Sequence, residues 1–336
     1  MKEFELIKRY FADRGLTRKD VVIGIGDDAA VINIPENAQL VVTTDTLVSG
    51  VHFFADINPR ALGHRAVAVN LSDIAAMGAE PAWLSIAVTL PEIDETWVKA
   101  FTDGIFEICE YYNVQVVGGD TTQGPLAITI SAKGLIPKGK ALTRSGAKPG
   151  DWIYVTGTLG DAGVAVDAIK NNHTLPLKYQ AFIHNRLDYP TPRVAIAQAL
   201  REVASAAIDI SDGLLADLGH VLEASAVGAV VHVEQLPLSD ALMNSVDESR
   251  YLEFALGAGD DYELLFTVPE DKRGALDVGM SHYGVKLTCI GQIMGQSGRL
   301  ELRRDNNPIT LELSGFEHFS QDSLAADVPD NSNKNE

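Results

Sequence analysis

The sequence predicts a mixed α/β (α+β) protein of two domains. The chain has 336 residues, 46% of them hydrophobic, which is enough for two cores. Strand-like runs alternate with runs of helical spacing along its length. The stretch 137–151 is rich in glycine, lysine and proline and predicts a boundary. We expect an N-terminal domain over 1–140, a C-terminal α/β domain over 150–320, and an acidic, aperiodic, disordered tail over 321–336.

In the first domain, apolar residues at helical spacing open the chain, and β-branched runs follow. Asn58 and Pro59 form the typical start of a helix, a cap followed by proline. The expected helices are 4–11, 59–77 and 94–112, and the expected strands are 21–25, 30–34, 40–45, 83–90, 114–117 and 127–135.

The same patterns continue beyond the boundary, again with strands and helices interleaved. The expected strands are 152–156, 207–210, 230–233, 262–268 and 287–293, and the expected helices are 161–170, 179–187, 193–203 and 212–225.

Charge and composition exclude several classes of protein. The net charge of −19 disfavours binding to nucleic acid and to anionic membrane surfaces. No apolar run approaches the roughly 18 residues of a membrane span, and the N-terminus lacks the pattern of a signal peptide. Cys109 and Cys289 are too few for a disulfide framework or a cysteine zinc site. We expect a cytoplasmic protein.

Clusters of aspartate stand at predicted strand or turn ends. Asp27 and Asp28 follow a Gly-x-Gly, where an ordinary hairpin turn is the favoured interpretation. Thr43, Thr44 and Asp45 end a predicted strand and offer hard oxygen ligands, which suit magnesium and not zinc. A surface aspartate at a strand end is an equal alternative.

Asp73 is the most informative single residue. It lies in a predicted helix that is apolar almost all round, and such a helix is buried. A buried carboxylate costs several kcal/mol unless its charge is compensated. A metal ion is one compensation, and an ion pair with Arg65, two turns back, is the other.

Two further groups follow predicted strands. Gly118 and Gly119 allow a ligand to approach the backbone, and Asp120 beside them can hold a metal, although a tight turn is as good an interpretation. Asp209 and Asp212 bracket a strand-to-helix turn, where Ser211 or Asp212 is also a candidate N-cap. The chain lacks a Walker phosphate loop, a kinase His-Arg-Asp motif and a Gly-x-Ser-x-Gly elbow.

Together these motifs resemble the thiamine-monophosphate kinase family, in order and over about residues 4–319. The matching segments are 24–28, 43–46, 70–79, 118–121, 142–151 and 209–213. The resemblance implies a fold shared with aminoimidazole ribonucleotide synthetase and selenophosphate synthetase. It also implies a homodimer whose N-terminal domains build a shared β-barrel. The implied activity is ATP-dependent phosphorylation of thiamine monophosphate to thiamine diphosphate, the last step of cofactor synthesis.

The resemblance also implies roles for individual residues. Asp260 stands where the family commonly has glutamate, and Phe316 stands at a variable aromatic position, where a core aromatic is a comparable alternative. Asp73, Asp120 and Arg144 are the implied catalytic residues. The implied ligands of several Mg²⁺ ions are Asp28, Thr43, Thr44, Asp45, Asp73, Asp120, Asp209 and Asp212; the implied ATP contacts are Gly119, Asp120, Arg144 and Ser211; the implied substrate contacts are His52, Asp260 and Phe316.

This chemistry explains the aspartates. Two phosphates repel each other by about 4 kcal/mol per pair of unit charges at 4 Å and an effective dielectric near 20, so metal ions must offset that charge. The attacking phosphate oxygen is already ionised, so we expect direct in-line transfer without a strong base or a phospho-enzyme. Arg144 is expected to stabilise the transferring group, with a solvated loop arginine as the alternative. Three rival functions are an ATP-dependent amide-activating synthetase, a non-catalytic cation binder and a metal-dependent phosphatase.

Overall fold

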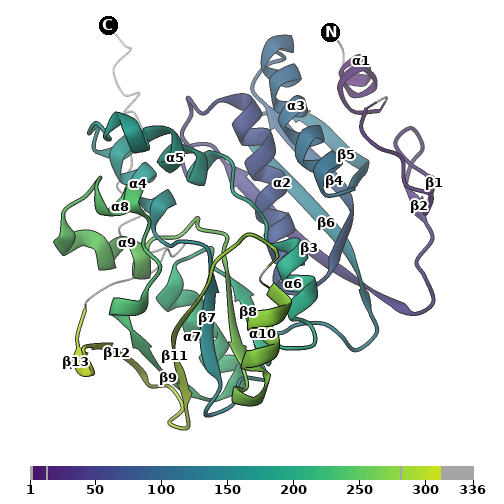
Figure 1. The fold of residues 1–336 in the computed structure, drawn as a ribbon. Helices are drawn as coiled ribbons and strands as arrows, with labels where there is room; N and C mark the ends of the chain where they lie inside the picture. The colour runs from purple at the N-terminus through teal and green to yellow at the C-terminus, as the bar shows by residue number, and fades with distance from the viewer. Residues whose placement is uncertain (1–2, 13, 281, 312–336) are drawn as a thin grey trace, which may run out of the picture.

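A computed structural model of the chain describes residues 3–12, 14–280 and 282–311 (Figure 1). Phe316 and the expected tail at 321–336 lie outside these residues. The described residues contain a four-stranded and a seven-stranded mixed sheet with helices beside them, which confirms the mixed α/β prediction.

The N-terminal sheet has the strand order β3-β6-β4-β5. Its neighbours are antiparallel except for the parallel pair β4 and β5. The strands are β3 (Ala38–Val48), β4 (Glu80–Leu90), β5 (Gln115–Gln123) and β6 (Ala127–Pro137). A separate hairpin joins β1 (Val21–Ile23) to β2 (Val31–Ile32), and α1 (Glu3–Ile7) leads into a π-helical turn at Lys8–Ala12.

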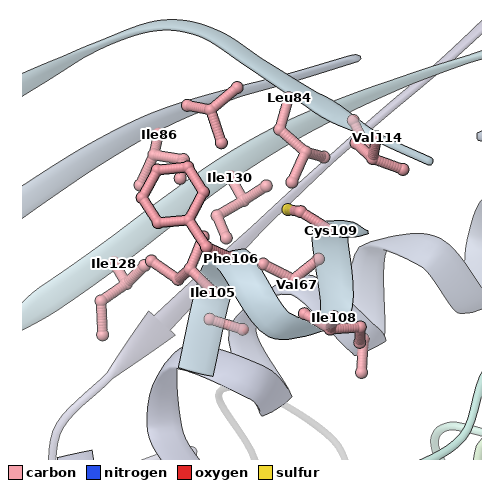
Figure 2. Close-up of a cluster of buried hydrophobic side chains, with 14 of the residues drawn as sticks. Val67, Leu84, Ile86, Ile105, Phe106, Ile108, Cys109, Val114, Ile128 and Ile130 are labelled. Carbon is pink, nitrogen blue, oxygen red and sulfur yellow. The ribbon is translucent and has the colours of Figure 1, made fainter. Parts of the chain in front are cut away.

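Helices α2 (Pro59–Ala76) and α3 (Glu95–Tyr111) cover one face of this sheet. Figure 2 shows their apolar side chains against those of the strands, for example Val67 and Ile105 near Ile130. The two helices cross closely, because a Cβ on Gly63 would lie 2.0 Å from the carbonyl oxygen of Phe101. Asn58 and Asp94 cap the two helices with their side chains, as their positions in the sequence predict.

The C-terminal sheet has the order β13-β12-β9-β11-β7-β10-β8 and is antiparallel except between β12 and β9. Its strands are β7 (Trp152–Thr156), β8 (Ala206–Asp209), β9 (Gly228–His232), β10 (Leu264–Val268), β11 (Leu287–Met294), β12 (Leu300–Arg304) and β13 (Asn307–Ile309). Its helices are α4 (Asp161–Lys170), α5 (Leu177–Asp188), α6 (Val194–Leu200), α7 (Leu214–Ser225), α8 (Asp240–Met243), α9 (Tyr251–Gly257) and α10 (Arg273–Met280).

Two groups expected at strand ends lie inside strands instead. The ladder between β3 and β6 continues to Val48, so Thr43–Thr46 is part of β3. The ladder between β4 and β5 continues to Gln123, so Gly118–Thr122 is part of β5. The sequence placed the strand ends here because polar residues and glycine favour turns. Pairing with the neighbouring strands outweighs that local preference and extends both strands.

Helix α2 joins the two halves of the molecule. It is buried on nearly every side, and it contacts β3 and β6 of one half and α6 and β8 of the other. Ser72 on α2 donates a 2.6 Å hydrogen bond to Asp209 at the end of β8. In the part of the chain that the structure describes, no helix is both long and apolar enough to cross a membrane.

Candidate active site

A cavity of about 940 Å³ lies where α2 meets the C-terminal half. The second half of β3, the loop after it, α2, α4, the turn from β8 to α7 and the loop before β10 all contribute to its wall. The cavity therefore gathers residues from more than 200 positions of sequence. Eight residues that the sequence singled out line it: Thr44, Asp45, His52, Asp73, Asp209, Ser211, Asp212 and Asp260.

One face of α2 forms a wall of this cavity. Arg65, Val69 and Asp73 all line it and stand four residues apart, which is the spacing of one helical face. Asp73 accepts a 2.5 Å hydrogen bond from the hydroxyl of Thr43, so Thr43 supports the site from just outside the cavity.

The ion-pair interpretation of Asp73 is wrong. Arg65 donates from its Nη2 to Asp260 at 2.8 Å, and Asp260 also accepts a 3.1 Å hydrogen bond from the hydroxyl of Tyr262. Tyr262 is a cavity residue that the sequence did not single out. Arg65 therefore does not compensate the charge of Asp73.

Those carboxylates repel one another. Burial, together with repulsion from Asp73, raises the pKa of Asp209 to about 7 and that of Asp45 to about 6. Burial also raises the pKa of Asp73, against the opposing effects of its Thr43 hydrogen bond and the charge of Arg144. The fold therefore holds negative charge here that a bound cation would stabilise.

The donor atoms fit magnesium by their chemistry, because they are carboxylate and hydroxyl oxygens. Within the described residues, however, no three His, Cys, Asp or Glu side chains come close enough together to hold a metal ion. Oxygens from a bound ligand, such as those of a phosphate, would have to complete any coordination shell.

The turn from β8 to α7 is held by a residue that the sequence analysis missed. The carboxylate of Asp217, in the first turn of α7, accepts hydrogen bonds from the backbone N–H groups of Ser211 (3.0 Å) and Asp212 (3.1 Å). The N-cap is Gly213, without a side-chain cap bond, so the prediction that Ser211 or Asp212 caps the helix is wrong. An acidic residue four positions beyond the cap was the available signal.

A second cavity, of about 620 Å³, holds three other predicted residues: Asp28, Gly119 and Asp120. Its wall combines β5, the loop between β1 and β2, and the first helical segment. Asp27 accepts a 2.8 Å hydrogen bond from the Asp28 N–H, which confirms its expected role in a turn.

The sheet separates this group from the first cavity. Asp45 on β3 pairs with Ile130, which pairs with Ile86, which pairs with Gly119 on β5. At roughly 4.8 Å per strand, the two ends of this row are about 14 Å apart, so one chain cannot bring Asp45 and Asp120 to one ion.

Arg144 stands apart from both cavities, whereas His52 lines the first one. Arg144 lines neither cavity, although its positive charge lowers the pKa values of both Asp73 and Asp217. His52 accepts a 3.0 Å hydrogen bond from the Val48 N–H at its Nδ1. Phe316 is not among the described residues.

Comparison with known proteins agrees with this architecture. Residues 26–136 match the AIR synthase related protein N-terminal domain, and residues 148–303 match the C-terminal domain of the same proteins. The thiamine-monophosphate kinase of Salmonella typhimurium is 53% identical over 95% of this chain and 98% of its own length.

Two solved structures are also similar. The crystal structure of thiamine-monophosphate kinase from Stenotrophomonas maltophilia K279a is 44% identical, with a TM-score of 0.81 over 87% of this chain and 93% of that one. AaThiL complexed with AMPPCP and TMP is 32% identical, with a TM-score of 0.74 over 88% of this chain and 92% of that one. The chain therefore belongs to the thiamine-monophosphate kinase family.

Proposed function

We propose that this protein transfers the γ-phosphoryl group of ATP to thiamine monophosphate, forming thiamine diphosphate. The observation that carries the proposal is the cavity lined by Asp45, Asp73 and Asp209, in which burial and repulsion from Asp73 raise the pKa values of the other two carboxyl groups. The relative AaThiL was solved with AMPPCP, an ATP analogue, and TMP, which supports the same pair of ligands here.

Mg²⁺ is the proposed cofactor, as several ions. Asp45, Asp73 and Asp209 are the residues that would hold it in the first cavity, with Thr44 and Asp212 beside them. When bound, it supplies positive charge that offsets repulsion between the reacting phosphates. Held beside these carboxylates through that ion, the acceptor phosphate would be in position for in-line transfer without a base from the protein.

Individual residues are proposed to contact ATP and the substrate. We assign Gly119, Asp120, Arg144 and Ser211 to ATP, and His52, Asp260 and Phe316 to the substrate. Asp28 and Asp120, in the second cavity, are proposed to hold metal with the nucleotide. We keep the two-domain division at 1–140 and 150–320. The described cysteines are both free, which supports the proposed cytoplasmic location.

The separation of the two cavities supports a homodimer, which we propose as the active form. Asp45 and Asp120 lie on opposite edge strands, so a second copy that pairs its β5 with this β3 would bring them together. Exposed apolar side chains mark the same part of the molecule, including Val42 (56% exposed) on β3 and Val22 (58%) on β1. We propose that the two N-terminal sheets close a shared barrel.

The test is a turnover assay with ATP, Mg²⁺ and thiamine monophosphate, read by phosphorus NMR. Wild-type protein should form thiamine diphosphate. Asp73→Asn should lower kcat on the order of 100-fold or more, because it removes a charge that holds the metal.

The control is Asp305→Asn, which changes an exposed carboxylate in the turn between β12 and β13, outside both cavities, and should leave kcat within about twofold. Folded wild-type protein that makes no thiamine diphosphate would overturn the proposal. Release of free phosphate alone would identify a phosphatase instead.

A further inference from the structure

We propose that Arg65 and Tyr262 are positioning residues that hold Asp260 for recognition of the organic part of the substrate. This inference rests on the proposed function. It concerns the end of the cavity that lies two helical turns along α2 from Asp73.

The hydrogen bonds to Asp260 divide its two oxygens between two tasks. Oδ1 accepts from Arg65 Nη2 at 2.8 Å and from the Tyr262 hydroxyl at 3.1 Å. No described residue donates to Oδ2, and the Asp260 side chain is 30% exposed whereas that of Arg65 is 5% exposed. The carboxylate is therefore fixed from the buried side and keeps one oxygen available to a ligand in the cavity.

Arg65 is not placed for stability alone. Its Nε is buried without a hydrogen-bond partner among the described residues, which is an unfavourable arrangement for a charged group. Asp188 also lies within reach of its charge. A single donor from Arg65 to Asp260 keeps the carboxylate in place while Nε of the same guanidinium stays without a partner, an unfavourable arrangement of the kind found at functional sites.

The backbone around Asp260 adopts an unfavourable conformation. Asp260 has φ +67° and Tyr262 has φ +50°, a region in which side chains other than glycine are uncommon and tyrosine is an outlier. Hydrogen bonds to the β8–α7 turn hold this shape: the Asp260 N–H donates to Ser211 O at 2.9 Å, and the Tyr262 N–H donates to Ile210 O at 2.8 Å.

Side-chain hydrogen bonds on the buried side also fix the loop before β10. The carboxylate of Asp261 accepts hydrogen bonds from the Gly160 N–H at 3.0 and 2.9 Å, and that of Glu263 accepts from Arg193. These contacts maintain the strained backbone, and the strained backbone fixes the direction of the partly exposed Asp260 side chain.

The substrate offers two groups that a carboxylate oxygen recognises. One is the amino donor of its pyrimidine ring, and the other is its cationic thiazolium ring.

The experiment is steady-state kinetics on Tyr262→Phe, which removes one hydroxyl and keeps the ring. We expect KM for thiamine monophosphate to rise about tenfold, the loss typical of one hydrogen bond to a charged group. The kcat and the KM for ATP should stay within about twofold, because the reacting phosphates lie at the other end of the cavity.

The matched control is Tyr112→Phe. Its hydroxyl, like that of Tyr262, makes one hydrogen bond, 2.8 Å to Pro192 O, but Tyr112 does not line the cavity. Both variants should lose similar thermal stability, and KM should rise only for Tyr262→Phe. An equal KM for the two variants would overturn the proposal.

A double-mutant cycle separates positioning from a general structural effect. In an Asp260→Ala background, Tyr262→Phe should change KM by less than about twofold, because there is no carboxylate left to position. Arg65→Lys, which keeps the charge, should show the same dependence on Asp260. Effects that multiply in the cycle would overturn the proposal. Wild-type protein without kinase activity would instead overturn the proposed function.

Discussion

At the scale of single residues, the site contains buried carboxylates whose negative charges destabilise the folded state. Asp45 is half-buried beside Asp73, and both burial and this neighbour disfavour its charged form. Among the described residues, no cation pairs with Asp45 as Arg65 pairs with Asp260. Residues of this kind lower stability and are retained where they bind or react.

This predicts a pH-dependent stability in metal-free protein. Asp45 has a pKa of about 6 in the fold against an ordinary value of 3.8. The stability that the folded state gains from the neutral form of this group is therefore fully present below about pH 4 and is lost as pH rises through 6. Asp45→Asn should therefore raise the free energy of unfolding by about 1–2 kcal/mol at pH 8, after allowance for solvent screening, and by little at pH 4.

Thermal melts in EDTA at the two pH values measure this difference. Asp56→Asn, in an exposed loop, is the control and should shift Tm by the same small amount at both. A Tm gain for Asp45→Asn that is equal at pH 4 and pH 8 would contradict the prediction.

At the scale of elements, two adjacent glycines of β5 have different tasks. A Cβ on Gly119 would lie 1.9 Å from Ile86 O on the paired strand, whereas a Cβ on Gly118 would meet nothing within 4 Å. Gly119 therefore permits the close pairing of β4 and β5. Gly118 is the position where a ligand has room to approach the backbone.

The two alanine variants should separate these tasks. Gly119→Ala should lower Tm by about 5–10 °C, because two strands must move apart. Gly118→Ala should leave Tm within about 2 °C and raise KM for ATP if the nucleotide approaches this strand. Equal Tm values for both variants would show that β4 and β5 are not packed as described.

The sequence predicted most elements because their signals are local. Asn58 and Asp94 cap the helices that the patterns placed after them, and the apolar stretch around Asp73 is a buried helix. The limits of β3 and β5 could not be predicted, since they depend on which strands pair. Strands β12 and β13 were missed because their short, charged sequence, with Arg303 and Arg304, lacks an apolar run.

At the scale of the whole molecule, contacts between residues far apart in the sequence could not be predicted from local signals either. The resemblance to a family named residues far apart in the sequence, and eight of them line one cavity. The partner of Arg65 was not predictable, because Asp260 lies 195 positions away in the sequence. The separation of Asp120 from Asp45 likewise depends on strand order, which no single motif encodes.

The proposed dimer is testable at this scale. Val42→Asp would place a charge on the exposed part of β3, and we expect the particle mass from light scattering to fall to one chain, 36.1 kDa. Kinase activity should fall with it, because each complete site needs two copies. Leu177→Asp, at an 87% exposed position of α5, is the control and should remain dimeric and active. A wild-type monomer with full activity would contradict the proposal.

Helix α2 has one more consequence, which concerns the length of the occupant. Arg65 and Asp73 stand eight residues apart on one rigid helix, a distance of about 12 Å along its axis. The helix is packed on nearly all sides, so this distance cannot adapt to the ligand. A molecule that engages both Asp260, which Arg65 holds, and the carboxylates around Asp73 must therefore fit a spacing that the helix fixes. The rigidity of α2 therefore limits the length of a ligand that can contact both ends of the cavity.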